Sequence, residues 1–278
     1  MDILSIVKQA WKLLWTNKYL WVFGFFMAGV GGGAGGPPSK HGTGTGGGHE
    51  ALPIWLWPVL AVAALLAIAA LVMHVVSEAA LIEGIRERKD EQAFSLREGF
   101  RFGLRHFWRV LGVKALAALV VVLVGAAIVA PILVAVTGHA PLWIGIPVGV
   151  LFALVGVPAL LTGYFLYEYA LRIAVLDGAP ATDAYRAAIA FLHGRIVNSI
   201  VLAVTSSLSS LVAGLAGLVA AVPAAVVGLA VYAAAGLVPG IVAGAVVLVP
   251  LMIPIFGAQG TFRSAVWTLG FLSTRKAA

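Results

Sequence analysis

Residues 115–167 read ALAALVVVLVGAAIVAPILVAVTGHAPLWIGIPVGVLFALVGVPALLTGYFLY, a stretch of 53 residues without Asp, Glu, Lys or Arg. A helix of about 20 apolar residues crosses the hydrocarbon core of a bilayer, so this stretch is long enough for two crossings and a turn. A second uncharged stretch, of 67 residues, lies between Arg195 and Arg263. Both stretches predict an all-α integral membrane protein built from pairs of helices.

The composition of the whole chain agrees with this prediction. Of its 278 residues 62% are hydrophobic and 10% charged, with a mean hydropathy of +1.04, whereas soluble domains carry about 25% charged residues. The net charge of +7 indicates basic residues at a membrane surface, where they set topology and meet anionic headgroups, rather than a nucleic-acid partner. The chain has no cysteine, which excludes disulfides and thiolate metal sites.

Apolar length predicts six crossings, with ends uncertain by several residues. Between the last two, residues 223–238 are too apolar for an ordinary loop, so they either extend a helix or lie in the outer interface. Residues 31–50, GGGAGGPPSKHGTGTGGGHE, are expected to form a flexible outer loop without P-loop spacing. The predicted crossings lie at roughly 18–35, 53–77, 109–136, 141–167, 196–222 and 239–258.

The distribution of charge orients these crossings. Of the 18 Lys and Arg residues only Lys40 falls in a segment expected to face outward, and Glu50 is the only such residue among the 11 Asp and Glu. The positive-inside rule makes the other side cytoplasmic. We therefore expect a multi-pass protein with both termini in the cytoplasm and a nearly uncharged outer face.

Two patterns recur along the chain at similar spacing. The tetrad QAWK at 9–12 returns as EGFR at 98–101 and DAYR at 183–186. The segment EAALIEGI, from Glu78, returns as EYALRIAV and QGTFRSAV after 90 and 91 further residues. These patterns predict one membrane domain, residues 1–278, made of three parallel pseudo-repeats, each with a cytoplasmic interfacial amphipathic helix, an outward crossing and an inward crossing. The copies span about 1–90, 91–178 and 179–278.

The tetrads predict membrane anchors. An aromatic ring can lie at headgroup depth while the cation that follows it meets phosphate. The small residue before each ring would let another helix approach closely, and Ser95 with Glu98 has the spacing of a helix cap. The expected anchors are Trp11 with Lys12, Phe100 with Arg101, and Tyr185 with Arg186; the small residues are Ala10, Gly99 and Ala184.

The second pattern begins with a carboxylate or amide in each copy: Glu78, Glu168 and Gln259. Ionisable groups within a membrane are candidates for function. At the inner boundary, however, they are expected to reach water or to form interhelical pairs or caps, and this interpretation is preferred to proton or ion transport. The arginines considered as partners are Arg101, Arg105, Arg186 and Arg263. Only Pro239, Pro250 and Pro254 hint at the broken crossing that a transporter would use.

The remaining polar residues predict no catalytic constellation, so we expect a protein without enzymatic activity, metal or cofactor. His74 is interpreted as a hydrogen-bonding side chain, with axial ligation of a haem or chlorophyll as the alternative. His41, His49 and Glu50 have no recognised metal-site spacing. The hydroxyl run from Thr205 to Ser210 resembles a hydrogen-bonding helix face more than a nucleophile.

A resemblance to a known group of proteins rests on the threefold layout and on three stretches of sequence: WKLLWTNKYLWVFGFF, EAALIEGIRER and REGFRFGLRHFWRVL. The chain resembles a loose group of six-span prokaryotic membrane proteins akin to the membrane domain fused to some bacterial glycerophosphodiester phosphodiesterases. The resemblance covers nearly the whole chain and implies location in the prokaryotic cytoplasmic membrane. Because no soluble catalytic domain is included, no phosphodiesterase residue can be carried over.

Two functional hypotheses follow from the sequence. The first is a non-enzymatic membrane subunit or scaffold, whose partners are membrane lipids with anionic cytoplasmic headgroups and either another membrane protein or further copies of itself. The second is a small-molecule or lipid transporter, with a path lined by Glu78, Glu168, Gln259 and the hydroxyls of the fifth crossing.

Overall fold

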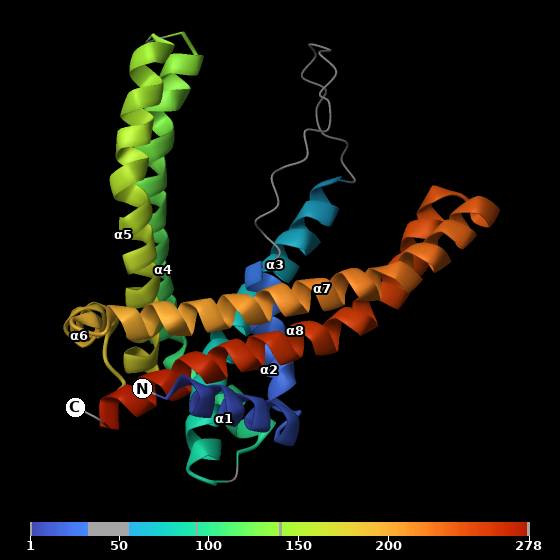
Figure 1. The fold of residues 1–278 in the computed structure, drawn as a ribbon. Coiled ribbons are helices and arrows are strands. Elements are labelled where there is room, and N and C mark those ends of the chain that lie inside the picture. The colour runs from blue at the N-terminus through green and yellow to red at the C-terminus, as the bar shows by residue number, and fades with distance from the viewer. Residues whose placement is uncertain (1, 33–55, 93, 139–140, 277–278) are drawn as a thin grey trace. The chain divides into compact units, whose positions relative to one another are not determined.

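The computed structural model describes residues 2–32, 56–92, 94–138 and 141–276, and within these ranges it holds eight α-helices and no strand. Figure 1 shows their arrangement along the chain. The all-α prediction is thereby confirmed for the described residues. The helices are α1 (Ile3–Thr16), α2 (Leu20–Gly32), α3 (Leu56–Lys89), α4 (Leu96–Val136), α5 (Leu142–Leu176), α6 (Ala181–Leu192), α7 (Ile196–Ala235) and α8 (Leu237–Lys276).

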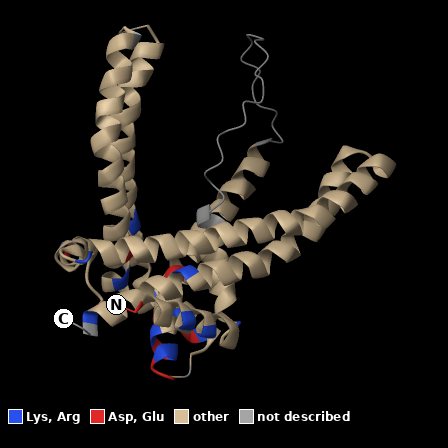
Figure 2. Cartoon of the chain, in the orientation of Figure 1, with Lys and Arg blue, Asp and Glu red and all other residues tan. Residues whose placement is uncertain are grey.

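Five of these helices, α3, α4, α5, α7 and α8, are long and apolar enough to cross a membrane. In the most apolar 18-residue window of each, only 6 to 17% of the residues are buried. A soluble protein rarely exposes so much apolar surface. In Figure 2 the ribbon has none of the colours of Lys, Arg, Asp or Glu along two arms: residues 115–136 of α4 with 142–167 of α5, and 196–235 of α7 with 237–262 of α8. The chain is therefore a multi-pass membrane protein.

Consecutive spans form two hairpins, visible in Figure 1. In the first, α5 lies close against α4 because small residues face it: a Cβ at Gly145 would overlap with Ala135, and one at Gly149 would overlap with Ile132. In the second, α7 turns into α8 at the single residue Gly236, whose φ of +92° favours glycine.

Residues 223–238 are helical except at Gly236, in line with the first of the two alternatives given for them, that they extend a helix. Helix α7 continues to Ala235 and α8 begins at Leu237. Helix α8 also runs without a break through Pro250 and Pro254, so the hint of a broken sixth crossing is wrong. Membrane helices tolerate proline where neighbouring groups satisfy the backbone.

The second predicted interfacial helix, at 95–108, is not a separate element. It forms the first part of α4, which is 41 residues long and continues into the crossing, because no residue of the breaking type separates the two parts. The cap at its start is confirmed: the backbone N–H and hydroxyl of Ser95 each donate to a carboxylate oxygen of Glu98 at 2.8 Å, and the Glu98 N–H donates back to Ser95 Oγ at 3.3 Å. This is a reciprocal capping box.

Helices α1 and α6 are separate elements, each followed by a break before the next helix. Gly194, with a φ of +77°, separates α6 from α7. No residue with a positive φ separates the first part of α4 from the rest of that helix. Each short helix buries one face at a spacing of about four residues. The buried side chains are Ile6, Ala10 and Leu14 in α1, and Ala184, Ala188 and Leu192 in α6. Helix α6 begins after Pro180 without a side-chain cap.

Helix α2 covers most of the predicted first crossing. Its 13 residues span about 20 Å at 1.5 Å per residue, less than the roughly 30 Å hydrocarbon core. Residues 33–35 of that crossing lie outside the described ranges, as does the rest of the predicted outer loop at 33–50. Among the residues that the structure describes, α2 is not one of the five candidate spans.

The chain divides into two compact units: one contains residues 1–3, 105–204 and 267–278, the other 4–104 and 205–266. In the second unit α2 and α8 touch backbone to backbone. A Cβ at Gly24 would overlap with the carbonyl oxygen of Gly257, and one at Gly260 would overlap with the backbone of Gly24. Thr261 Oγ1 donates to Leu20 O at 3.1 Å beside this contact. Small residues allow such close packing in membranes.

We expect Gly24→Ala to destabilise the protein, because the added methyl group has no space at the α2–α8 contact. Overpacking costs about 1–3 kcal/mol. Gly214→Ala is the matched control, since Gly214 lies in α7 of the same unit with open space around it. The measurement is the thermal midpoint of both variants in one detergent, followed by tryptophan fluorescence. Equal midpoints for Gly24→Ala and wild type would contradict this contact.

Candidate functional site

The three recurring segments lie in buried parts of long helices. Residues 78–85 of α3 and 168–175 of α5 are buried throughout. In the third copy Gln259 is half-buried, and most of the residues that follow it are buried. Glu78 and Glu168 are only 4% and 1% exposed, so neither reaches water freely. The recurring pattern therefore falls at packing positions, fully in the segments of α3 and α5 and for the most part in that of α8.

Glu168 forms an ion pair within its own helix. One turn later on α5, Arg172 Nη1 donates to Glu168 Oε2 at 2.7 Å, and both side chains are almost fully buried. Residues four apart face one another on a helix, so the spacing in EYALR could have revealed this pair. The sequence analysis named four other arginines and missed Arg172.

Aromatic rings enclose this ion pair within the first unit. The Arg172 guanidinium carbon lies 5.7 Å from the ring centroid of Trp267 in α8, close enough for a cation–π interaction. Trp267 makes an edge-to-face contact with Tyr169, at 5.7 Å between centroids. The Tyr169 hydroxyl is hydrogen-bonded to Ser199 Oγ of α7 at 2.8 Å. Around the buried ion pair, ring contacts join α5 to α8, and the Tyr169–Ser199 hydrogen bond joins α5 to α7.

Helix α3 carries the Glu78 segment in the second unit. Within the same segment Glu83 is buried and pairs with Arg86. Two residues after Arg86, Arg88 Nε donates to the Tyr19 hydroxyl at 2.6 Å, and its guanidinium lies 5.4 Å from the Tyr19 ring centroid. The charged end of α3 is thus tied to the chain just before α2.

Gln259 of α8 contacts the hydroxyl face of α7. Its Nε2 donates to Ser210 Oγ at 2.9 Å. Ser209 and Ser210 both donate to the carbonyl oxygen of Ser206, at 2.6 and 3.2 Å. The hydroxyl run therefore forms a hydrogen-bonding helix face, as predicted.

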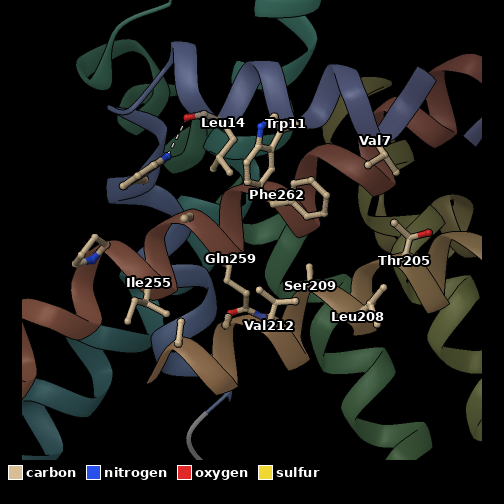
Figure 3. A pocket seen from close by; sticks show the side chains of 15 residues that line it. Val7, Trp11, Leu14, Thr205, Leu208, Ser209, Val212, Ile255, Gln259 and Phe262 are labelled. Atoms are coloured by element: carbon tan, nitrogen blue, oxygen red, sulfur yellow. Dashed lines mark hydrogen bonds between the residues drawn. The ribbon is translucent and has the colours of Figure 1, made fainter. Parts of the chain in front are cut away.

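A cavity of about 550 Å³ opens beside Gln259, entirely within the second unit. Figure 3 shows its walls: α1 on one side, α7 and α8 on the other. Trp21 of α2 adds an indole, whose Nε1 donates to Leu14 O at 3.0 Å. The sequence did not reveal the cavity, since it depends on how α1 lies against the α7–α8 hairpin. The lining residues are Val7, Trp11, Leu14, Trp21, Thr205, Leu208, Ser209, Val212, Ala213, Ala216, Pro254, Ile255, Ala258, Gln259 and Phe262.

The tetrad residues divide between exposed and packed positions. The three small residues, Ala10, Gly99 and Ala184, are buried, and a Cβ at Gly99 would overlap with Phe23 of α2. Of the anchors, Trp11, Lys12, Phe100, Arg101 and Arg186 are exposed.

Tyr185 is more buried than the other five anchor candidates. Its side chain is half-buried, and its hydroxyl donates to the carbonyl oxygen of Val113 in α4 at 3.2 Å. Burial raises the pKa of Tyr185 to about 12, which favours the neutral phenol that donates this bond. The hydroxyl of this candidate anchor is therefore held by α4.

Among the described histidine candidates, His74 lies beside a backbone carbonyl group of α2. His74 Nδ1 lies 3.0 Å from the carbonyl oxygen of Phe26, a contact in which the imidazole nitrogen donates. Among the described residues no group of three or more His, Asp or Glu could hold a metal ion. His41, His49 and Glu50 lie outside the described ranges.

One family model matches residues 14–269, nearly the whole chain, and its description is a family of unknown function, DUF7544. The chain belongs to this family. The match includes the second and third tetrads and all three recurring segments. No curated protein and no solved structure matches the chain.

We expect Glu168→Gln to destabilise the protein strongly, because it leaves the buried Arg172 charge without its counter-charge. Breaking a buried ion pair in this way costs about 3–5 kcal/mol. Asp183→Asn is the control: its pair with Arg186, at 3.7 Å, is exposed and should contribute about 0.5 kcal/mol or less. Thermal midpoints in one detergent provide the comparison.

The double variant Glu168→Leu with Arg172→Leu tests the cause. Removing both charges should restore part of the stability that Glu168→Gln loses, since apolar replacements of buried pairs are often tolerated. If Glu168→Gln is as stable as Asp183→Asn, the ion pair does not have the structural role assigned to it.

Proposed function

We propose that this protein is a non-enzymatic integral membrane subunit or scaffold that associates with other membrane proteins or with lipids. The observation that supports this most strongly is the contrast between its polar and apolar parts. The buried Glu168 is engaged by Arg172, whereas the apolar faces of five long helices remain exposed. Such faces are stable only when lipid or another membrane helix covers them.

The proposed architecture has six crossings in three parallel pseudo-repeats, with α2 as the first crossing. Helix α1, the charged first part of α4, and α6 would lie in the cytoplasmic interface. The shared burial of Ala10, Gly99 and Ala184 supports equivalent positions in the three copies. The buried segments that begin near Glu78 and Glu168 support it further.

The proposed location is the prokaryotic cytoplasmic membrane, with both termini in the cytoplasm. The charge distribution supports this orientation through the positive-inside rule, and exposed cations such as Lys12, Arg101 and Arg186 are suited to anionic headgroups. The likeness to the membrane domain of some glycerophosphodiester phosphodiesterases remains a proposal about the fold alone.

Transport is the second candidate, and one observation favours it. Gln259, Ser209 and Thr205 line the cavity of the second unit, which could lie on a path for an amphiphilic or apolar molecule. The unbroken course of α8 and the Glu168–Arg172 pair favour the scaffold role instead. Transporter sites commonly use interrupted helices and accessible ionisable groups.

Native mass spectrometry of protein extracted with its own lipids, combined with proteomics on the same sample, tests the proposal. We expect a protein partner in fixed stoichiometry, because only a specific complex survives extraction in a constant ratio. The control is Glu168→Gln, which should lose stability and partner together. A chain that is recovered alone or as a homo-oligomer, with one selectively bound small molecule, would contradict the subunit role and favour transport.

A further inference from the structure

The first part of α4 carries two parallel rows of exposed side chains. The rows begin at neighbouring residues, and each repeats at every fourth residue, the spacing at which side chains are neighbours along a helix. One row is apolar and 39 to 78% exposed, and the other consists of four exposed arginines. Protein interfaces are enriched in aromatic side chains and arginine, so this face has the composition of a docking surface. The apolar row is Leu96, Phe100, Leu104 and Trp108, and the arginine row is Arg97, Arg101, Arg105 and Arg109.

The opposite side of the same stretch is packed against protein. Gly99 and Gly103 are buried one turn apart. A Cβ at Gly99 would overlap with Phe23 of α2, and one at Gly103 would overlap with the backbone of Val76 in α3. Among the described residues, no ion pair involves a member of the arginine row. The protein therefore holds this stretch from one side and leaves both rows available to a partner.

The two rows lie on a helix that continues into its span. The uncharged part of α4 begins after Lys114, whose Nζ donates to the Tyr167 hydroxyl of α5 at 3.1 Å. From Lys114 back to Leu96 the helix extends about 27 Å at 1.5 Å per residue, whereas one headgroup layer is roughly 5–8 Å thick. A tilt of about 40° still leaves Leu96 about 20 Å from the level of Lys114.

Helix α4 contains no proline before Pro131 and is unbroken over all 41 residues. A turn from the headgroup plane into the bilayer would require a sharp kink, which proline or an interrupted backbone ladder normally causes. Of the part proposed for the cytoplasmic interface, only the turns next to Lys114 therefore fit among the headgroups. The start of both rows reaches beyond them.

The chemistry of the rows specifies the kind of partner. Rows at every fourth residue are ridges that pack into the grooves of a second helix. Guanidinium groups bind carboxylates through two parallel hydrogen bonds, so a row of arginines is complementary to a row of Asp or Glu. The described acidic residues of this chain form no such row: at the end of α3, Glu87 lies between Arg86 and Arg88. This composition favours a different protein over a second copy.

We infer that this face of α4 docks an amphipathic helix of another protein, in which an apolar row is flanked by aspartates or glutamates. The apolar row of α4 packs against that apolar row, and the arginines pair with the carboxylates. The inference rests on the proposed subunit role, and for this face it specifies a protein helix among the associates that the role allows.

Photo-crosslinking of the full chain in its native membrane tests the inference. The photoreactive p-benzoylphenylalanine replaces Phe100, and mass spectrometry identifies the adduct and the cross-linked segment. We expect one protein adduct, through a segment with an acidic row beside an apolar row at helical spacing. The same group in place of Ile189, an exposed apolar residue of α6, is the matched control. It should give less than about a tenth of that adduct, because cross-linking requires direct contact.

The arginine row is tested by the triple variant Arg97→Gln, Arg101→Gln and Arg105→Gln. The adduct at position 100 should fall about tenfold, since each exposed pair with a carboxylate contributes about two- to threefold. Replacing the same arginines with lysine should keep the adduct within about threefold of wild type, because the charge remains. Arg186→Gln, on the exposed side of α6, should leave the adduct unchanged. All variants should share the thermal midpoint of wild type, because the substituted side chains are exposed.

Several results would overturn the inference: an adduct with lipid only, an adduct with a second copy of this chain, a protein adduct through a segment without an acidic row, no adduct, or an equal adduct in the triple glutamine variant. Native mass spectrometry separates this inference from the subunit role. A partner that the triple glutamine variant retains in full would support the subunit role and overturn docking on α4. The absence of any partner from wild type would contradict both.

Discussion

A hydrocarbon environment offers no water to backbone N–H and C=O groups, and the rest of this structure depends on that constraint. The uncharged stretch 115–167 can enter the bilayer only if every backbone group finds a partner within the protein, which helices provide. The result is a pair of hairpins, α4 with α5 and α7 with α8. Glycines such as Gly145 and Gly236 supply the close contact and the tight turn that side chains would prevent.

The same constraint confines ionisable side chains to one end of each long helix. A helix of 41 residues such as α4 is about 60 Å long, twice the thickness of the hydrocarbon core, so its charged first part can remain outside. Glu168 is buried among protein side chains, where Arg172 neutralises its charge and Trp267 covers the guanidinium. A buried pair contributes less to stability than it costs when broken, which makes this cluster sensitive to single substitutions.

The sequence was sufficient to predict what depends on composition and local spacing. The long uncharged stretches of the sequence predicted the apolar helices α3, α4, α5, α7 and α8. The spacing of Ser95 and Glu98 predicted the capping box. The continuity of α4 from Leu96 to Val136 was not predicted, because a boundary was placed where charged residues give way to apolar ones although no proline separates the two parts.

Side-chain partners were harder to predict than helices. Arg172 was not predicted as the partner of Glu168, because the arginines considered were all on other helices. Arg172 lies four residues after Glu168 on the same helix. The Tyr185 bond to Val113 O and the cavity beside Gln259 depend on tertiary placement, which local patterns do not encode. Family membership adds the expectation that the same arrangement recurs across nearly the whole length of related chains.

The central claim is that the exposed apolar arms lie in lipid or against another membrane protein, and single-cysteine labelling in native membranes tests it most directly. The chain has no cysteine, so Leu154→Cys and Val219→Cys, at positions each 72% exposed, report without background. Arg186→Cys, where the native side chain is 83% exposed, is the control outside the spans. We predict that a water-soluble maleimide labels Arg186→Cys rapidly and the two arm positions only after denaturation. Equally rapid labelling at all three positions would contradict the account.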